Sequence, residues 1–304
     1  MSGRQKVHIL INPDSGVLNP FNAMAHALLE HWETPDRELT IQFTTSKQDG
    51  RRKARKAVDE GADVLLVVGG DGAINSIGSE LIGSQTALGA VPSGSGNGFA
   101  RHFGIPMDIK KAVAVLAKAE PRDIDVGFAD DKPFFVTCSL AWDASLVEAF
   151  EKSPIRGILP YVFAAVYQFF EYKPQVFRVN LDDREEILIE DPMLFTAANL
   201  TQYGGGAMIA PGASADDGLL QLVTLRKRDL PWVLPMLGSV FSGTIDRLDR
   251  IDNHSFKTMV VSRNTGGPMQ LDGELIQAPA EVRITVRPRA LKVLVPQRHQ
   301  AHNP

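Results

Sequence analysis

The sequence contains very little cysteine, which limits the covalent and metal chemistry available to the chain. Cys138 is the single cysteine among 304 residues. An intrachain disulfide and a cysteine metal cluster are therefore excluded, and a reducing compartment is expected. The first residues also lack an apolar run of signal-peptide length before the first strand-like segment, so we expect a cytoplasmic protein.

The sequence also lacks long apolar runs and an excess of positive charge. No segment offers the roughly 20 uninterrupted apolar residues that a membrane-spanning helix requires. The formal net charge of −4 provides no positive field for a nucleic-acid backbone, so no nucleic-acid partner is expected. Any membrane contact must therefore be peripheral and local, and we expect it to be transient and at the inner face.

Familiar glycine-rich nucleotide fingerprints are missing as well. The sequence contains neither GxxxxGK[ST] nor a GxGxxG with the correct flanks, so a P-loop and a dinucleotide fingerprint are not indicated. Internal repeats and low-complexity linkers are not found either. What the chain does have is an average soluble composition, 44% hydrophobic and 22% charged, and enough length for two globular domains.

The apolar pattern predicts two domains of different class. From residue 6 to 119, short strand-like runs alternate with segments of helical spacing. This predicts an α/β domain over residues 1–122, with a parallel sheet whose faces are covered by helices. Over residues 123–288 many short strands follow one another, which predicts a mainly antiparallel domain.

Four further segments complete this division. Helices are expected at 157–172 and at 230–241, inside the second domain. A strand at 289–296 can pair with either domain and would join the first one as a late addition. Residues 297–304 form a polar tail.

Two glycine-rich turns each follow a predicted parallel strand. Their sequences are GGDGAIN, starting at Gly69, and PSGSGNGFAR, starting at Pro92. Loops at the carboxyl ends of parallel strands can present backbone amides and helix N-termini to an anion. Glycine allows a phosphate to approach the backbone closely, and Asp71 could hold Mg²⁺ against it. The pair of turns therefore predicts a phosphate-binding edge of the sheet.

Three other turns allow two interpretations each. The turn that starts at Asn12 ends the first strand at the same predicted edge, where it is either an ordinary turn or a third phosphate loop. Asp-Gly pairs occur at Asp217-Gly218 and at Asp272-Gly273. Asp-Gly is a strong hairpin signal, so each pair is either a structural turn or a placed carboxylate.

Taken together, these segments resemble the diacylglycerol kinase catalytic domain family, which includes sphingosine kinases and bacterial lipid kinases. GGDGAIN, PSGSGNGFARHFGIP, GGG with PGASADDGLL, and LDGE occur in that family's order, from Asn12 to about Pro288. The resemblance implies an NAD kinase/diacylglycerol kinase-like α/β domain that binds the nucleotide. It also implies a β-sandwich domain for the lipid substrate, with ATP and Mg²⁺ as cofactors.

The resemblance also implies the residues of the site. Asp272 and Glu274 would be catalytic, with Asp272 as the base for the acceptor hydroxyl. A structural metal would be held by Asp217 with Ser214 and Leu219. The nucleotide would be bound by Asn12, Thr45, Gly70, Asp71, Gly72, Ala73, Ile74, Asn75, Ser76, Ser95, Gly96 and Asn97.

The function implied is that of an ATP-dependent lipid kinase of phospholipid metabolism. It would transfer the γ-phosphoryl group to the hydroxyl of diacylglycerol, a sphingoid base or a related lipid presented by a membrane surface. An NAD-kinase-like enzyme with a soluble substrate is an alternative. A catalytically inactive homologue is another, because Ala73 stands where the family usually has threonine. The sequence leaves a homodimer open.

Overall fold

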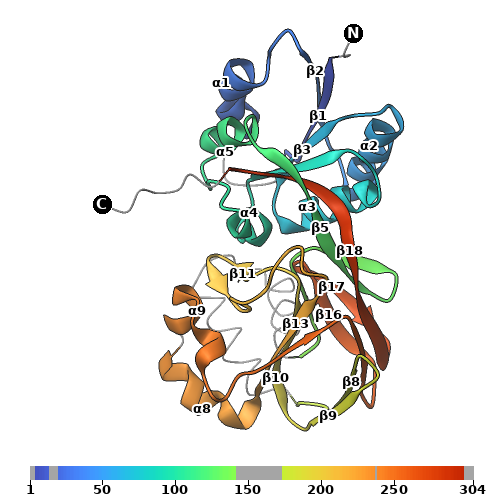
Figure 1. Ribbon diagram of the computed structural model, residues 1–304, viewed down its shortest axis with the longest axis vertical. Helices are drawn as coiled ribbons and strands as arrows, with labels where there is room; N and C mark the ends of the chain where they lie inside the picture. The colour runs from blue at the N-terminus through green and yellow to red at the C-terminus, as the bar shows by residue number, and fades with distance from the viewer. Residues whose placement is uncertain (1–3, 14–19, 142–172, 237, 298–304) are drawn as a thin grey trace. The chain divides into compact units, whose positions relative to one another are not determined.

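The computed structural model describes residues 4–13, 20–141, 173–236 and 238–297 of the chain (Figure 1). The chain divides into two compact units, each with its own core. Unit 1 comprises Met1–Ile124 and Arg289–Pro304, and unit 2 comprises Asp125–Pro288. Among the helices of the described residues, none has the length and apolar character needed to cross a membrane.

Unit 1 is built on a parallel sheet, as predicted. Its strands run in the order β2-β1-β3-β4, and β4 is followed by the last part of β18. The bounds are β1 (Gln5–Ile11), β2 (Arg37–Phe43), β3 (Val64–Gly69), β4 (Ala87–Pro92) and β18 (Glu281–Val295). The helical segments are α1 (Pro20–His31), α2 (Lys47–Asp59), α3 (Asp71–Gly78), η1 (Ser79–Leu81), α4 (Gly98–His102) and α5 (Ile109–Leu116).

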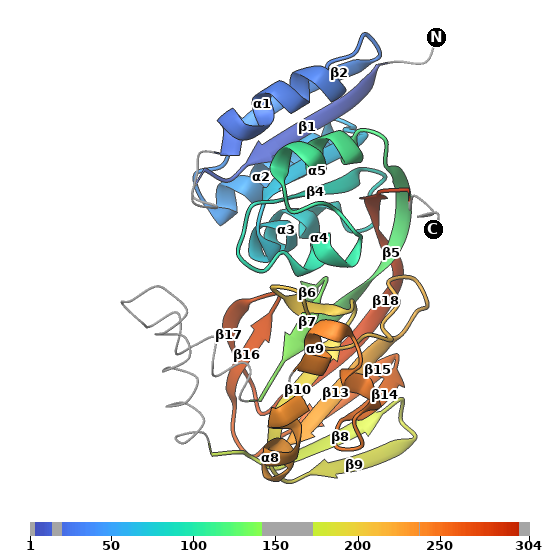
Figure 2. The same cartoon turned by 90° about the vertical axis from the view of Figure 1, so that its left-hand side faces the viewer.

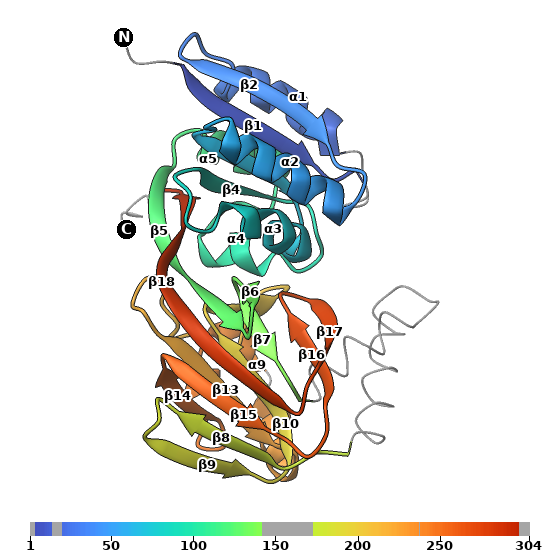
Figure 3. The same ribbon diagram turned by 90° about the vertical axis from the view of Figure 1, so that its right-hand side faces the viewer.

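Helices cover both faces of this sheet. Helices α1 and α5 lie on one side, and α2 lies on the other with α3 beside it (Figures 1 and 3). Helices α1 and α5 are linked by Trp32, the residue after α1. Its Nε1 donates a buried hydrogen bond of 2.9 Å to the carbonyl of Val113 in α5. Every residue of β3 and β4 is buried. This explains why both strands read as uninterrupted apolar runs, since a parallel sheet is buried on both faces.

Unit 2 is a sandwich of antiparallel sheets (Figure 2). One sheet has the order β14-β13-β10-β7-β16-β17, with β7 (Thr137–Ser139), β10 (Pro192–Ala198), β13 (Leu220–Arg226), β14 (Asp252–Phe256), β16 (Gly267–Leu271) and β17 (Glu274–Ala278). The other pairs the first part of β18 with β15 (Thr258–Ser262), β8 (Phe177–Leu181) and β9 (Glu185–Ile189). The remaining strands are β5 (Glu120–Ala129), β6 (Lys132–Phe134), β11 (Gln202–Gly204) and β12 (Ala207–Met208).

The six-stranded sheet of unit 2 has an apolar core on each face at its inner strand β13. Leu222 of β13 belongs to the core that also contains Val179 and Ile284 of the other sheet. The next residue, Val223, belongs to a second cluster that contains Val233 and Ile245. Neighbouring residues of β13 thus pack into different cores, because successive side chains of a strand point to opposite faces of the sheet. The predicted fold class, an α/β domain followed by an antiparallel sandwich, is confirmed.

Two predicted elements differ in the structure. The helix expected at 230–241 is broken into α8 (Leu230–Val233), η3 (Leu234–Met236) and α9 (Gly238–Ser242), between η2 (Lys227–Asp229) and η4 (Ile245–Arg247). Pro235 explains the break, because it has no N–H for a helical hydrogen bond. The strand expected over 134–140 is split into β6 and β7. The helix expected at 157–172 lies outside the described residues.

Candidate functional site

The three predicted phosphate-side loops of unit 1 meet at one edge of its sheet. Asn12 follows β1, Gly70 follows β3, and Ser93 follows β4. The backbone N–H of Asn12 donates to the carbonyl of Val68 at 3.2 Å, and that of Ser93 donates to Gly69 at 3.1 Å. The structure therefore brings together the loops that contain all the predicted nucleotide residues except Thr45, which follows β2.

The loops after β3 and β4 touch through two glycines. A Cβ atom placed on Gly94 would lie 2.5 Å from the Cα atom of Gly70, and a Cβ on Gly70 would lie 3.1 Å from the Cα atom of Gly94. Real Cβ atoms do not approach a backbone atom to 2.5 Å, so Gly94 has no room for a side chain. Gly70 was predicted as a phosphate contact, and its lack of a side chain also serves the packing of the two loops.

Asn97 and Asp71 use their side chains to hold these loops in place. Asn97 has φ +51°, and its side-chain amide bonds both backbone groups of Gly94, at 2.9 and 2.7 Å. The carboxylate of Asp71 accepts hydrogen bonds from the first amides of α4, Gly98 N at 2.9 Å and Phe99 N at 3.0 Å. Asp71 therefore caps α4 and ties the second loop to the first. Its predicted contact with Mg²⁺ stays a prediction.

Helix α3 carries six of the predicted nucleotide residues. Asp71, Gly72, Ala73, Ile74, Asn75 and Ser76 form its first six positions. Gly70 precedes the helix as its N-cap and offers no side-chain hydrogen bond to it. A helix N-terminus without a side-chain cap suits an anionic ligand. Ile74 is buried at 3% exposure, so any contact from this position would come from its backbone.

A pocket of about 220 Å³ opens beside α3. Its lining combines residues with hydroxyl side chains, the amide-bearing Asn12, the basic residue Lys47 and the apolar Ile77. Four predicted nucleotide residues, Asn12, Thr45, Ala73 and Ser76, belong to this wall. The full lining is Asn12, Thr44, Thr45, Ser46, Lys47, Gly50, Ala73, Ser76 and Ile77.

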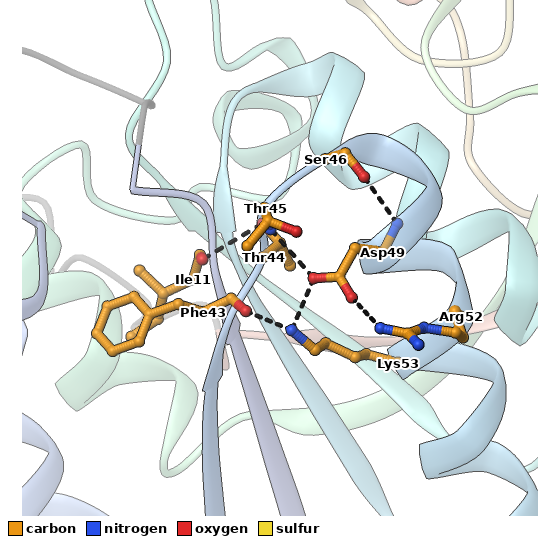
Figure 4. A network of polar contacts seen from close by, with 8 residues as sticks. All are labelled: Ile11, Phe43, Thr44, Thr45, Ser46, Asp49, Arg52 and Lys53. Carbon is orange, nitrogen blue, oxygen red and sulfur yellow. Dashed lines mark hydrogen bonds and ion pairs between the residues drawn. The ribbon is translucent and has the colours of Figure 1, made fainter.

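A polar network holds the part of the wall formed by Thr44, Thr45 and Ser46 (Figure 4). Ser46 caps α2 by accepting from Asp49 N at 3.1 Å, and Thr45 N donates back to Asp49 Oδ2 at 3.1 Å. Lys53 Nζ binds both Asp49 Oδ2 and the carbonyl of Phe43 at 2.6 Å. The hydrogen bond from Lys53, followed by those from Arg52 and Thr45 N, holds the pKa of Asp49 far below its usual range. Three donors on one carboxylate thus link the start of α2 to the end of β2 beside the pocket.

Asp49 was missed by the sequence reasoning, although the sequence carries a signal for it. Ser46 is followed three positions later by an acidic residue, which is close to the capping-box pattern at a helix start. The basic residues of α2 obscure this pattern, because six of its thirteen residues are lysine or arginine. Asp49 forms ion pairs with Arg52 and Lys53 because residues three and four positions apart lie on the same face of a helix.

Asp272 forms the turn between β16 and β17, where Leu271 pairs with Glu274. Asp272 has φ +49° and Gly273 has φ +85°, so the Asp-Gly hairpin is confirmed. Asp272 is 4% exposed, and its side chain bonds a segment far away in the sequence. The carboxylate accepts hydrogen bonds of 2.7, 2.8 and 2.9 Å from the backbone amides of Phe135, Val136 and Thr137.

These three bonds explain why the chain leaves the strand pattern between β6 and β7. The amides of residues 135–137 point to a buried carboxylate rather than to a neighbouring strand. Three N–H donors stabilise negative charge on Asp272 and fix the direction of its oxygens. Glu274, the other predicted catalytic residue, is half-buried at the start of β17. The catalytic role of both residues stays a prediction.

The three predicted metal ligands lie in one short turn of unit 2. Asp217 Oδ1 accepts from the backbone N–H of Leu219 at 3.0 Å, and Ser214 Oγ donates to Asp216 at 3.0 Å. Asp125, which is 0% exposed, accepts from Gly218 N at 2.6 Å and so anchors the turn. Sequence reasoning did not single out Asp125, because it lies more than ninety positions away in an ordinary strand.

The chemistry of this turn suits a hard cation, although few carboxylates take part. Across the part of the chain that the structure describes, no three His, Cys, Asp or Glu side chains gather as a metal site. A cation at Ser214, Asp217 and Leu219 would therefore be bound by one carboxylate and by main-chain or hydroxyl oxygens. Oxygen donors of this kind fit Mg²⁺ or Ca²⁺.

Models of two protein families match the sequence. The model described as diacylglycerol kinase catalytic domain matches residues 6–129, and that described as YegS C-terminal NAD kinase beta sandwich-like domain matches residues 137–295. A diacylglycerol kinase of Mycobacterium tuberculosis (strain CDC 1551 / Oshkosh) is 30% identical over 299 residues, which cover 96% of each chain. A diacylglycerol kinase of Bacillus subtilis (strain 168) is 28% identical over 234 residues, which cover 74% of this chain and 75% of the relative.

A solved structure shows the same fold. The crystal structure of a diacylglycerol kinase from Bacillus anthracis (strain Sterne) superposes with a TM-score of 0.73, over 98% of this chain and 99% of that one. The two sequences are 16% identical over this alignment. At that identity the likeness bears on the fold alone, and both units take part in it.

Proposed function

The chain belongs to the diacylglycerol kinase catalytic domain family, and from this premise we propose that it transfers the γ-phosphoryl group of ATP to a lipid hydroxyl. One observation carries the proposal. Four of the residues implied as nucleotide contacts line a single pocket, at the sheet edge where three loops follow parallel strands. Such an edge is where open α/β sheets bind their ligands.

Phosphoryl transfer needs alignment and charge neutralisation more than covalent chemistry. On the nucleotide side, the N-terminus of α3 and the loop of Ser95 and Gly96 would bind the phosphates. The pocket between α2 and α3 then takes another part of ATP, with Lys47 adding a positive charge. The packed glycines and the hydrogen bonds of Asp71 and Asn97 keep these donors in position before ATP binds. Binding therefore costs little conformational entropy in the loops.

On the acceptor side, the proposal assigns Asp272 and Glu274 to the lipid hydroxyl. The three amides around Asp272 fix the direction of its oxygens. The hydroxyl proton would move late, as the oxygen bonds to phosphorus, because an alcohol is far less acidic than a carboxylic acid. Mg²⁺ would neutralise phosphate charge, with Asp71 as the candidate ligand near the phosphates and Asp217 as the candidate ligand of a structural ion.

A lipid acceptor is supported by the relatives that are named diacylglycerol kinases. The proposal adds that the protein works in the cytoplasm and meets its substrate at the inner face of the membrane. An enzyme acting on a soluble acceptor would have the same nucleotide pocket. A homologue without activity would bind ATP and transfer nothing.

A radiolabelled-ATP assay over diacylglycerol, sphingosine, ceramide and a polyprenol tests the proposal. We expect labelled product that extracts into organic solvent with at least one of these lipids. Label that enters only water-soluble products of a cell extract would support the soluble-acceptor alternative. ATP binding without transfer to any acceptor would support an inactive homologue.

A pair of variants on α2 tests the pocket itself. We expect Lys47→Met to weaken ATP binding by at least about tenfold, since a hydrogen bond that involves a charged group contributes about 1.5–3 kcal/mol. Lys56→Met is the matched control, because Lys56 is exposed on the same helix and its ion-pair partner is Glu60. Equal ATP affinities of the two variants in calorimetry would remove the pocket from nucleotide binding.

A further inference from the structure

Three polar side chains lie in one row across the six-stranded sheet of unit 2. Ser139 of β7 is paired with Thr196 of β10 on one side and with Gln270 of β16 on the other. Residues directly opposite each other in neighbouring strands point to the same face of a sheet. All three are buried, with exposed fractions of 0% for Ser139 and Thr196 and 4% for Gln270. We call Ser139, Thr196 and Gln270 the polar row.

The polar row lies on the face of the sheet that carries the second core cluster. Val223 of β13, the residue opposite Thr196, belongs to that cluster. Cys138 and Leu271, the chain neighbours of the row in β7 and β16, belong to the core between the two sheets. Register therefore fixes the face of the row, at buried positions where apolar residues are the usual choice.

The two hydroxyls of the row have partners, but one oxygen of the amide does not. Ser139 Oγ lies 3.0 Å from Thr196 Oγ1 and 3.4 Å from the hydroxyl oxygen of Tyr203. Among the described residues, no donor reaches the buried Oε1 atom of Gln270. A buried acceptor without a donor is rare in proteins and costs free energy. A ligand that supplies the missing donor would recover this free energy.

The position of Gln270 distinguishes it from two other residues with a buried oxygen of this kind, Asn199 and Gln202. Asn199 donates from its amide nitrogen to the carbonyls of Asp125 and Phe135, both at 2.9 Å, so the fold sets its orientation. Gln202 belongs to β11, in a separate two-stranded sheet. Gln270 is in the strand that leads directly to the turn of the implied catalytic carboxylate.

Gln270 and that carboxylate, Asp272, border the same segment of chain. Gln270 is opposite Ser139 in β7, and Asp272 binds the amides of residues 135–137, which lead into β7. Two positions of chain separate the Cα atoms of Gln270 and Asp272 by about 7 Å at most. A small molecule with a hydroxyl at Asp272 therefore has its neighbouring atoms within reach of the Gln270 side chain.

We propose that Gln270 is a specificity-determining contact for the acceptor lipid, and that it selects a lipid with a free hydroxyl next to the hydroxyl that is phosphorylated. The second hydroxyl would donate to Gln270 Oε1. The polar row contains hydroxyls and an amide but no charge, which suits a hydroxyl better than an ammonium group. Glycerol with one acyl chain has such a hydroxyl, whereas in diacylglycerol the same oxygen is esterified and donates nothing. The inference deepens the proposed function and rests on it for the place of Asp272 at the acceptor.

Acceptor lipids that differ by one hydroxyl test this contact. The pair is 1-oleoylglycerol and 1-oleoyl-1,3-propanediol, which lacks only the middle hydroxyl, both in detergent micelles. We expect the wild type to use 1-oleoylglycerol with a kcat/KM at least about tenfold higher, which corresponds to about 1.4 kcal/mol. In Gln270→Met, which keeps the length of the side chain and removes its acceptor oxygen, the ratio should fall to about one.

Gln221→Met is the matched control for this substitution. Gln221 is opposite Ala198 on the same face of the same sheet, and its amide already pairs with Ser255. It should keep the wild-type ratio. Because Gln270→Met removes an oxygen without a partner, the free variant should melt no lower than the wild type. A wild-type ratio in Gln270→Met overturns the proposal, and a lower melting temperature beside that ratio would assign the amide to the fold alone.

Binding measurements separate this inference from the proposed function. Thermal shifts in the presence of each lipid need no turnover. The wild type should be stabilised more by 1-oleoylglycerol than by 1-oleoyl-1,3-propanediol, and Gln270→Met should be stabilised equally by both. If the wild type shows this difference but phosphorylates neither lipid, the proposed function fails and the contact stands. If it phosphorylates both equally well, the contact fails and the function stands. A wild type that neither binds nor phosphorylates 1-oleoylglycerol overturns the contact as well.

Discussion

Some residues of this protein stabilise the fold and also occupy positions implied to be functional, and a sequence motif does not distinguish the two roles. Asp272 is the clearest case, because a buried carboxylate that accepts three backbone amides also occupies the position implied to be catalytic. Asp71 is similar, since it caps α4 while standing in the implied phosphate loop. Substitution at such residues must therefore be read for stability and for activity at the same time.

Asp272→Asn should lower both the stability and the turnover of the protein. Asparagine keeps one acceptor oxygen but turns an NH₂ group toward backbone N–H donors, so a buried donor loses its partner. We expect the free energy of unfolding to fall by about 1–3 kcal/mol. If Asp272 is also the base, kcat should fall by a further factor of about 10² to 10⁴ at a temperature where the variant is folded.

Urea unfolding and a lipid-phosphorylation assay measure the two effects separately. Gly273→Ala is a useful comparison, since φ +85° at Gly273 makes alanine strained there without touching the carboxylate. It should lose stability and keep kcat. An Asp272→Asn variant with unchanged unfolding free energy would mean that the three amide bonds contribute nothing, and one with unchanged kcat would leave Glu274 as the acceptor-side candidate.

Gly94→Ala should disturb the nucleotide loops more than any ordinary glycine replacement. The new Cβ would lie 2.5 Å from the Cα atom of Gly70, so one of the two loops must move. We expect a fall in thermal stability and a loss of ATP affinity of at least about tenfold, because overpacking typically costs about 1–3 kcal/mol. Gly212→Ala is the control, since nothing lies within 4 Å of a Cβ there. Wild-type behaviour of Gly94→Ala would contradict the close contact of the loops.

At the scale of elements, α2 shows how carboxylates can offset part of the positive charge of a basic helix. Asp49 binds Arg52 and Lys53, and the side chain of Glu80, 6% exposed, lies under Arg51 and Arg55. Burial by itself raises the pKa of Glu80, but hydrogen bonds from Arg51 and Arg55 outweigh burial and leave this pKa below its usual value. The run of cations that stands out in the sequence is thus partly consumed by carboxylates held against it.

These carboxylates make unit 1 sensitive to acid. The pKa values of Asp49 and Glu80 are lower in the folded protein than their usual values of about 4. A group with a depressed folded pKa stabilises the protein fully above its unfolded pKa, and this stabilisation is lost as the pH falls toward the folded pKa. We therefore expect the melting temperature to decline as the pH is lowered below about 4.

The variant Glu80→Gln should weaken this decline. Its melting temperature at pH 7 should be lower than that of the wild type, because the two arginines lose their charged partner, and the difference should shrink at low pH. Thermal unfolding followed by circular dichroism between pH 7 and pH 3 measures this. A difference that stays constant over the whole range would show that the charge of Glu80 is not what stabilises the helix pair.

At the scale of the whole molecule, unit 1 is completed by the far end of the chain. β18 reaches the edge of β4, where Val293 pairs with Leu88, and Leu291, Val293 and Leu294 are buried there. Lys292 also forms an ion pair with Asp123 at 3.3 Å. A chain of residues 1–124 should therefore fold poorly by itself.

Joining residues 289–297 to the 1–124 chain through a flexible linker should restore cooperative unfolding. The gain arises because the added strand covers the apolar edge of β4 and buries three large side chains. Circular dichroism and thermal melts of both chains measure the effect. A cooperative transition of 1–124 alone at the same temperature would mean that the last strand contributes little to unit 1.

The sequence by itself determined the fold class and the family of this protein. Periods of two and of about four residues, together with glycine-rich turns, are local properties, and local properties are visible in a linear pattern. They were sufficient to predict the parallel sheet of unit 1, the antiparallel strands of unit 2 and the loops around Gly70 and Gly94. The family resemblance added candidate site residues that stay predictions.

Only the tertiary structure decided what those residues touch. Asp272 meets the amides of residues 135–137, and Asp125 meets Gly218, across more than ninety positions of chain in each case. The exposure of Trp232 in α8 and of Phe241 in α9 was equally hidden, because an apolar segment reads the same whether one side or both sides of it are covered. Such contacts depend on which segments pack together in space, and a one-dimensional pattern carries periodicity but not partners.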